Sequence, residues 1–219
     1  MRATIVADKN KAAVGEVETP APGPGEIRVR TKAAALNRAD LLVLAGHQHG
    51  AVGGAGAIVG LECAGEVESL GAGVTDFRIG DRVMCSARHA LAEFAVTDAG
   101  RAMKLPPEMD FARAATLPVA LQTMHNAIVT AGRLRKGESV LVQGASSGVG
   151  LMALQIAKFM GAGCVIGTST DAGRRARLKE FGADLALDSR DAGWVEEART
   201  ATGGKGVDLI VDQISGYVA

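Results

Sequence analysis

A run of small residues, Gly144-Ala145-Ser146-Ser147-Gly148-Val149-Gly150, is the segment of this chain best suited to hold an anion. A short apolar run precedes it, and apolar residues at helical spacing follow it. Small side chains let a backbone approach an anion, and the free N–H groups of a helix's first turn point toward it. The turn therefore predicts the pyrophosphate site of a dinucleotide, formed by Ser147, Gly148, Val149 and Gly150. The alternative is a strand-to-helix turn with no ligand.

The end of the next predicted strand bears on which dinucleotide would bind. Sites for NAD usually place Asp or Glu there, to bind the ribose hydroxyls. Here Gly167-Thr168-Ser169-Thr170 contains no acid, and Arg174 and Arg175 follow. Hydroxyls and a guanidinium suit a 2′-phosphate, so the sequence favours NADPH. Two alternatives stay open: both arginines form a solvated helix face, or Asp171 reaches the ribose.

From about residue 111 onward, strand and helix patterns alternate. Besides the helix after the glycine turn, we expect a long helix over 114–130 in spite of Pro118, and a basic helix over 173–181 ended by Gly182. The four expected strands are 139–142, 164–166, 185–187 and 207–211. This alternation predicts a doubly wound parallel sheet.

The first half of the chain has a different texture, rich in turns and short apolar runs. Strands are expected over 26–31 and 60–70, a turn into a third over 80–84, and one helix over 38–45 with Asn37 as its N-cap. The fold class is therefore α/β, with a mostly-β domain over 1–110 and a doubly wound parallel sheet over 111–219.

Composition excludes several classes of protein. The 219 residues carry 24 Lys and Arg against 24 Asp and Glu, so no basic excess favours nucleic acid or an anionic membrane. No apolar run is long enough to span a bilayer. Three widely spaced cysteines form no disulfide framework, which is typical of free thiols in a reducing cytoplasm.

Short motifs along nearly the whole chain together resemble the medium-chain dehydrogenase/reductase superfamily, in its zinc-free quinone oxidoreductase branch. Each motif is weak alone, but their order and spacing are specific. They are Asn37-Arg38-Ala39-Asp40, Gly60-Leu61-Glu62-Cys63-Ala64-Gly65, Gly80-Asp81-Arg82-Val83, Leu117-Pro118-Val119, Gly137-Glu138-Ser139-Val140, Phe181-Gly182-Ala183-Asp184 and Gly203-Gly204-Lys205-Gly206-Val207-Asp208.

This resemblance implies a GroES-like catalytic domain followed by a Rossmann domain, with the cofactor in the cleft between them. It places Asn37 and Thr123 near the nicotinamide, and Thr170 and Arg174 on the 2′-phosphate. Asn37 is also a good N-cap, and Thr123 has the alternative of bonding back to its own helix.

The resemblance also implies an activity: transfer of a hydride from NADPH to a quinone or an α,β-unsaturated carbonyl. The alternative is a non-catalytic NADPH-binding protein, and a third option is an enoyl reductase acting on carrier-bound chains. The proton donor stays unassigned, because Leu42 stands where relatives often carry Tyr. His47, His49 and His89 are candidates by chemistry alone.

Members of this family continue well beyond the length of this chain, which resembles their front two thirds. A chain that really ended at Ala219 would leave the strand over 207–211 without its neighbours. We expect such a chain to be marginally stable, prone to aggregation, or completed by another protomer. The full-length protein is expected to be a homodimer, since family dimers usually pair through the last Rossmann strand.

We predict that the protein holds no zinc. A catalytic zinc needs three converging protein ligands. Asn37 and Leu61 stand where zinc-dependent relatives carry Cys and His, and the four clustered cysteines of a structural zinc site are absent. Metal analysis of the purified protein should find far less than one zinc per chain. A stoichiometric, chelator-sensitive metal that supports activity would contradict the prediction.

Overall fold

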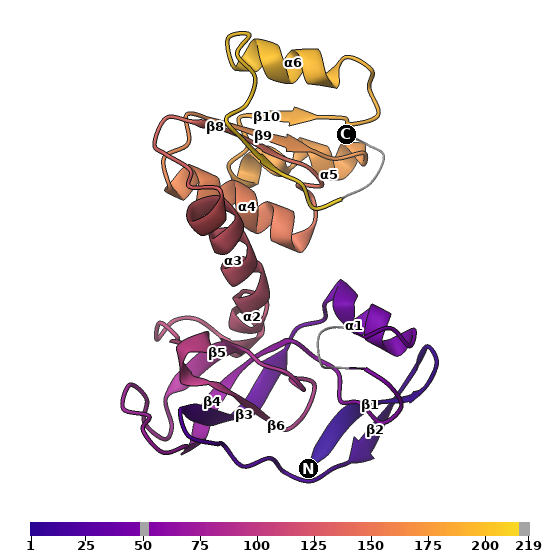
Figure 1. Cartoon of the computed structure of the whole chain (residues 1–219), viewed down its shortest axis with the longest axis vertical. Helices are drawn as coiled ribbons and strands as arrows, with labels where there is room; N and C mark the ends of the chain where they lie inside the picture. The colour runs from indigo at the N-terminus through magenta and orange to yellow at the C-terminus, as the bar shows by residue number, and fades with distance from the viewer. Residues whose placement is uncertain (49–52, 215–219) are drawn as a thin grey trace. The chain divides into compact units, whose positions relative to one another are not determined.

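A computed structural model describes residues 1–48 and 53–214 of the chain. It divides into two compact units, an N-terminal unit over Met1–Val119 and a C-terminal unit over Ala120–Ala219 (Figure 1). The domain boundary expected between residues 110 and 111 stays a prediction.

An antiparallel five-stranded sheet forms the centre of the N-terminal unit, with strand order β6-β3-β4-β5-β7. Its strands are β3 (Glu26–Ala34), β4 (Glu62–Leu70), β5 (Arg82–Ser86), β6 (Phe94–Asp98) and β7 (Ala102–Lys104). Side chains such as Ile27, Val67 and Val83 point into a closed core. A separate hairpin joins β1 (Arg2–Asp8) to β2 (Lys11–Glu16). Strands β2, β6 and β7 were not predicted; β2 is exposed along nearly its whole length and has no apolar alternation to reveal it.

Individual residues at helix ends, such as Asn37 and Pro118, determine where the helices between residues 38 and 131 begin. Helix α1 (Arg38–Leu44) begins after Asn37, as predicted, and Gly46 follows it with φ of +94°. The continuous helix expected over 114–130 was wrong. The chain forms α2 (Phe111–Ala115), then α3 (Pro118–His125), then a π-helical turn over Asn126–Ala131. Pro118 cannot continue a preceding helix, but its fixed φ suits the first position of a new one.

The C-terminal unit is the predicted doubly wound sheet. Four parallel strands lie in the order β10-β9-β8-β11: β8 (Ser139–Val142), β9 (Cys164–Thr168), β10 (Leu185–Leu187) and β11 (Leu209–Val211). Helix α4 (Gly148–Phe159) and the 3₁₀ turn over Leu178–Phe181 pack on one face, and α6 (Trp194–Ala201) packs on the other (Figure 1). Short helix α5 (Ala172–Ala176) follows β9. Alternate residues of β8 face opposite cores, Val140 toward α4 and Leu141 toward α6.

A buried carboxylate ties several parts of the N-terminal unit together. Glu62, at the start of β4, is 3% exposed. It accepts hydrogen bonds from Asn37 Nδ2 at 2.9 Å and from the Val119 N–H at 2.8 Å. That N–H belongs to the first turn of α3, where helix donors have no partner inside the helix. Burial raises the pKa of Glu62, the two hydrogen bonds oppose that rise, and nearby Asp40 adds to it.

The first turn of α4 offers a matched pair of substitutions. A Cβ on Gly150 would lie 2.6 Å from the Gly144 carbonyl oxygen, whereas a Cβ on Gly148 would meet no atom within 4 Å. Gly150→Ala should lower the free energy of unfolding by about 1–3 kcal/mol, because backbone must shift. Gly148→Ala should leave it unchanged or raise it by up to ~1 kcal/mol. Urea unfolding of both variants without cofactor checks this, and equal effects would contradict it.

The raised pKa of Glu62 predicts the direction in which stability changes with pH. Because its pKa is raised in the folded protein, its favourable contribution is present at low pH and is lost as pH rises through the folded pKa. Glu62→Gln is neutral at every pH. The stability of this variant relative to the wild type should therefore improve as pH rises from the acid range toward neutrality. Chemical unfolding across that range measures the difference, and a relative stability that falls with pH would disprove the assignment.

Candidate functional site

The glycine turn between β8 and α4 is held in place by the end of the neighbouring strand β9. Gly144 has φ of +66° and donates its N–H to Thr168 Oγ1 at 3.2 Å. The next N–H, of Ala145, donates to the Thr168 carbonyl at 2.9 Å. Thr168 is fully buried, so both bonds are shielded from water. The shape of the turn is therefore set by β9.

The first turn of α4 leaves donors available to an anion. Ser147 is its N-cap: its Oγ accepts the Gly150 N–H at 3.0 Å and donates to Gln213 Oε1 at 3.1 Å. The N–H groups of Gly148 and Val149 have no helical acceptor, since none precedes them at the required spacing. Ser147 and Gly148 are exposed, and the space beside Gly148 is open. This open, donor-rich turn fits the pyrophosphate of a dinucleotide.

Gly150 differs from the other three residues predicted for this turn. It is buried, and the Ser147 hydroxyl already accepts its N–H. Its lack of a side chain lets α4 approach the Gly144 carbonyl closely. Its part in the site is thus close packing of helix against turn, the role of the third glycine in dinucleotide-binding turns.

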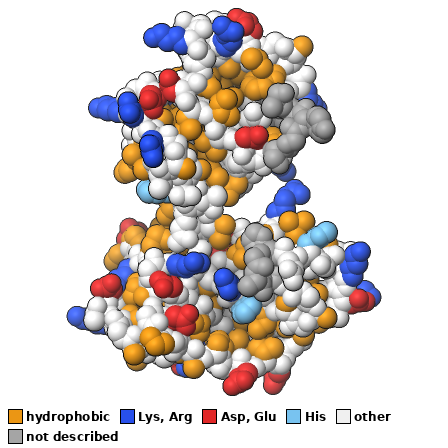
Figure 2. All heavy atoms as spheres, in the orientation of Figure 1, with side chains coloured by type: hydrophobic (Ala, Val, Ile, Leu, Met, Phe, Trp, Pro, Cys, Tyr) orange, Lys and Arg blue, Asp and Glu red, His pale blue; other side chains and the backbone are white. Residues whose placement is uncertain are grey.

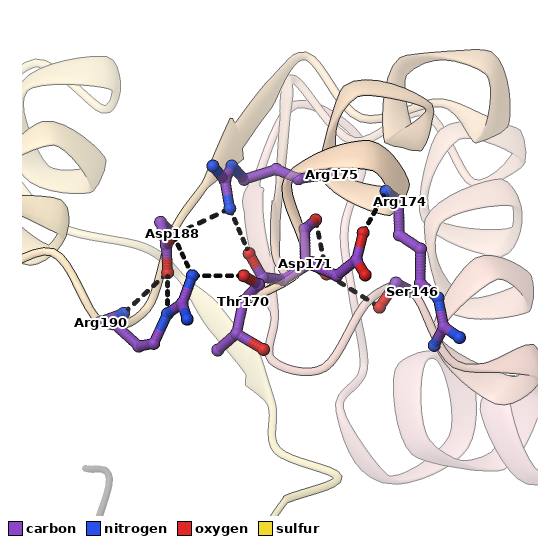
Figure 3. Close-up of polar contacts among 8 residues, drawn as sticks. Ser146, Thr170, Asp171, Arg174, Arg175, Asp188 and Arg190 are labelled. Atoms are coloured by element: carbon purple, nitrogen blue, oxygen red, sulfur yellow. Dashed lines mark hydrogen bonds and ion pairs between the residues drawn. The ribbon is translucent and has the colours of Figure 1, made fainter.

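The residues after β9 form a polar loop beside the glycine turn (Figure 3). Ser169 Oγ donates to Ser146 Oγ at 2.9 Å, which links the two loops. Thr170 is exposed. The Asp171 carboxylate caps α5 by accepting the Arg174 N–H at 2.8 Å. The exposed Arg174 side chain extends past Ser146 in the figure. The structure therefore places Thr170 in the loop and Arg174 in helix α5 that follows it, while Asp171 between them is engaged in the helix cap.

Arg175 does not share the setting of Arg174, although the sequence offered no way to separate them. It is half-buried and donates to the Ser169 carbonyl at 2.8 Å and to Asp188 Oδ2 at 2.9 Å. Asp188 also binds Arg190, which in turn donates to the Thr170 carbonyl. Sequence reasoning missed Asp188 and Arg190. The available signal was their place directly after β10, because parallel strands end at one edge of a sheet.

The two residues predicted near a nicotinamide belong to different units. Asn37 is half-buried in the N-terminal unit, with its Nδ2 on Glu62 and its backbone N–H on Asp40 Oδ2 at 2.7 Å. Thr123 is exposed on α3. Their role at the cofactor stays a prediction.

The candidate proton donors have different settings. His47 is exposed, and His49 lies outside the described residues. His89 has φ of +61°, and partial burial and the charge of Arg88 lower its pKa. A lowered pKa favours the neutral imidazole near pH 7, which disfavours a role as proton donor. Leu42, which stands in place of the family's Tyr, is 47% exposed.

The described part of the chain holds no group of three or more His, Cys, Asp or Glu side chains that fits a metal ion. The residues at the expected zinc position do not fit the metal either, since Asn37 binds Glu62 and Leu61 has no ligating atom. Whether zinc is absent from the protein stays a prediction.

No helix in residues 1–48 and 53–214 is long and apolar enough to cross a bilayer. On the face that Figure 2 shows, basic and acidic side chains are interspersed over both units. This agrees with the neutral overall charge.

Two protein-family models match the chain in sequence. Residues 23–107 match the alcohol dehydrogenase GroES-like domain, and residues 148–218 match a family described as zinc-binding dehydrogenase. The first match covers all five strands of the antiparallel sheet, and the second begins at the first residue of α4. The predicted fold class, a GroES-like domain and a Rossmann-type sheet, is confirmed.

Curated relatives include much longer proteins. The chain is 35% identical to a mycocerosic acid synthase-like polyketide synthase of Mycobacterium tuberculosis and 33% identical to the highly reducing polyketide synthase dmxL2 of a Cryptosporiopsis species. Each match covers 89% of this chain but only 9% and 8% of those proteins, respectively.

Solved structures match over nearly the whole chain. A quinone oxidoreductase of Pseudomonas syringae superposes with a TM-score of 0.85 at 28% identity, covering 98% of this chain and 67% of that one. The mycobacterial protein Rv1454c, solved with NADPH, gives 0.84 at 30% identity, with 99% and 68% covered. The CurK enoyl reductase gives 0.86 at 26% identity, with 98% and 68% covered. With the two domain matches in their expected order, these likenesses show that the chain belongs to the medium-chain dehydrogenase/reductase superfamily of oxidoreductases.

Proposed function

We propose that this protein is an NADPH-dependent oxidoreductase that transfers a hydride to a quinone or an α,β-unsaturated carbonyl without a metal. The observation that carries the proposal is the loop after β9. This loop leads into helix α5, where the exposed Arg174 guanidinium has no ion pair among the described residues, and Asp171, the acid between Thr170 and α5, is engaged in a helix cap. A 2′-phosphate is favoured by such a cation and repelled by a free carboxylate.

The glycine turn supports binding of the rest of the dinucleotide. The first-turn N–H groups of Gly148 and Val149 have no acceptor within α4, and a Cβ on Gly148 would meet no atom within 4 Å. Ser147, Gly148 and Val149 would hold the pyrophosphate, Gly150 would let the helix approach, and Thr170 and Arg174 would hold the 2′-phosphate. When bound, NADPH supplies the hydride. The protein's own contribution is then binding and orientation.

The choice of acceptor is supported by the side chains at the expected metal position. Asn37 and Leu61 supply neither a thiolate nor an imidazole, so this chain offers no Lewis acid there. Quinones and enones need little such help, because conjugation spreads the charge that develops as the hydride arrives. Likeness to the Pseudomonas syringae quinone oxidoreductase favours the same class.

A second candidate is reduction of enoyl thioesters on carrier-bound chains. The CurK enoyl reductase and the polyketide synthases are similar to this chain, and that similarity favours the candidate. Both candidates reduce a conjugated double bond with the same cofactor, so they differ in how the acceptor is presented. A non-catalytic NADPH-binding role remains the alternative to both.

One experiment separates these functions. The full-length protein is incubated with NADPH and, in parallel, with a simple quinone, a free enone and an enoyl thioester, and NADPH oxidation is followed by absorbance. Turnover of quinone and enone above thioester supports the proposal. Preference for the thioester supports the enoyl reductase, and binding of NADPH without turnover of any acceptor supports the non-catalytic role.

Arg174 tests the cofactor preference. Arg174→Ala should weaken NADPH binding by roughly 1.5–3 kcal/mol, the range for a charged hydrogen bond, and leave NADH binding nearly unchanged. Arg177→Ala is the matched control, because Arg177 is exposed on the same segment but is paired with Glu180 at 3.1 Å. Fluorescence titration of both cofactors measures the effect. Equal losses for NADPH and NADH would refute the role of Arg174.

A further inference from the structure

Asp188 holds two arginines that both reach back to the loop after β9 (Figure 3). Its Oδ2 accepts from Arg175 Nη1 at 2.9 Å and from Arg190 Nη2 at 3.0 Å, and its Oδ1 accepts from Arg190 Nε at 3.1 Å. Arg175 also donates to the Ser169 carbonyl, and Arg190 to the Thr170 carbonyl. We call these three side chains the Asp188 clamp.

The clamp supplies hydrogen-bond donors to backbone carbonyls just beyond the end of β9. Ser169 and Thr170 follow the last residue of β9, and their two carbonyls accept from the clamp. Asp188 is itself only 22% exposed, and hydrogen bonds from the side chain of Arg190 and from its backbone N–H, at 3.0 Å, are the main causes that hold the pKa of Asp188 well below the usual range. The carboxylate is therefore ionised throughout the neutral range and keeps both guanidinium groups in place.

The three arginines in this region have different partners. Arg175 and Arg190 both donate hydrogen bonds to Asp188, and each also donates to a backbone carbonyl of the loop after β9. The Arg174 side chain forms no ion pair among the described residues; the backbone N–H of Arg174 binds the Asp171 cap, and its carbonyl accepts the Arg177 N–H. Thr170 thus lies on a loop whose backbone is fixed from the side of β10, and that loop leads directly into helix α5, which carries Arg174.

We propose that Asp188 is a positioning residue for cofactor specificity: by holding Arg175 and Arg190 on the carbonyls of Ser169 and Thr170, it keeps the loop in the shape that receives a 2′-phosphate on Thr170 and Arg174. The inference rests on the proposed preference for NADPH. It adds a residue that need not touch the cofactor, and it assigns Arg190 to the backbone of the loop.

The charge of Asp188 and its positioning role predict opposite effects of the same substitution on binding of a 2′-phosphate, so the direction of the change distinguishes them. Asp188→Asn removes a negative charge close to the phosphate site and frees two guanidinium groups. If charge alone mattered, a 2′-phosphate would bind more tightly. If the clamp positions the loop, the loosened loop must be ordered on binding, and the 2′-phosphate binds more weakly.

The test uses 2′,5′-ADP and 5′-AMP, which differ only in the 2′-phosphate, with calorimetric titration of the full chain. The wild type should bind 2′,5′-ADP more tightly. Asp188→Asn should weaken 2′,5′-ADP by roughly three- to tenfold and change 5′-AMP less. Glu180→Gln is the matched control, since it removes an exposed carboxylate that pairs with Arg177 outside the clamp. It should leave the ratio of the two affinities unchanged.

A second variant keeps the proposal testable if Asp188→Asn folds poorly. Arg190→Lys preserves charge at a side chain that is 67% exposed, but a single ammonium cannot reproduce the two-nitrogen bond to Asp188 and the bond to Thr170. It should weaken 2′,5′-ADP selectively, again by a few fold.

The results distinguish the role of the clamp from the proposed preference for NADPH. If Asp188→Asn binds 2′,5′-ADP as tightly as the wild type or more tightly, or loses both ligands equally, the clamp has no specificity role while the proposed cofactor stands. If the wild type itself does not prefer 2′,5′-ADP over 5′-AMP, the proposed NADPH preference fails and the inference fails with it.

Discussion

The candidate dinucleotide site depends first on the hydrogen bonds between Thr168 and the glycine turn. Two successive N–H groups, of Gly144 and Ala145, bond to the side chain and the carbonyl of this one buried residue. Parallel pairing of β8 and β9 brings the ends of the two strands to the same edge, which is why this contact is available. Once the turn is fixed, the start of α4 follows, and with it the direction of its free donors.

Much of this arrangement was predictable because its signals are local. The apolar run of β8, the small residues of the turn and the helical spacing of α4 stand next to one another in the chain, so the unit can be recognised without knowledge of tertiary contacts. The cap at Asn37 is equally local. The site's other features depend on residues far apart in sequence. Nothing near Arg175 shows that it, and not Arg174, meets Asp188, and nothing near Gly150 shows that the Gly144 carbonyl occupies the space of its side chain.

The helix broken at Pro118 shows a different failure of local reasoning. Apolar spacing alone continues through the break, and the missing N–H and the ring of Pro118 override it. The new helix that begins there needs acceptors for its first N–H groups, and Glu62 supplies one to Val119 from a distant strand. The same carboxylate binds the Asn37 amide. One buried acid thus binds both the first turn of α3 and the amide of a predicted site residue. These two hydrogen bonds offset part of the energetic cost of burying a charge.

Two acidic side chains lie at the edge of the parallel sheet, and their hydrogen-bond partners bear on whether either carboxylate is available to a ligand. A rule that ties an acid after the second strand to the ribose of NAD concerns a carboxylate free to bind. Asp171 and Asp188 both lie at this edge. Asp171 is engaged by the backbone N–H of Arg174, and Asp188 by the guanidinium groups of Arg175 and Arg190. The Thr170 hydroxyl and the Arg174 guanidinium are then the polar groups on which the proposed preference for a 2′-phosphate rests, although two acids lie at the same edge.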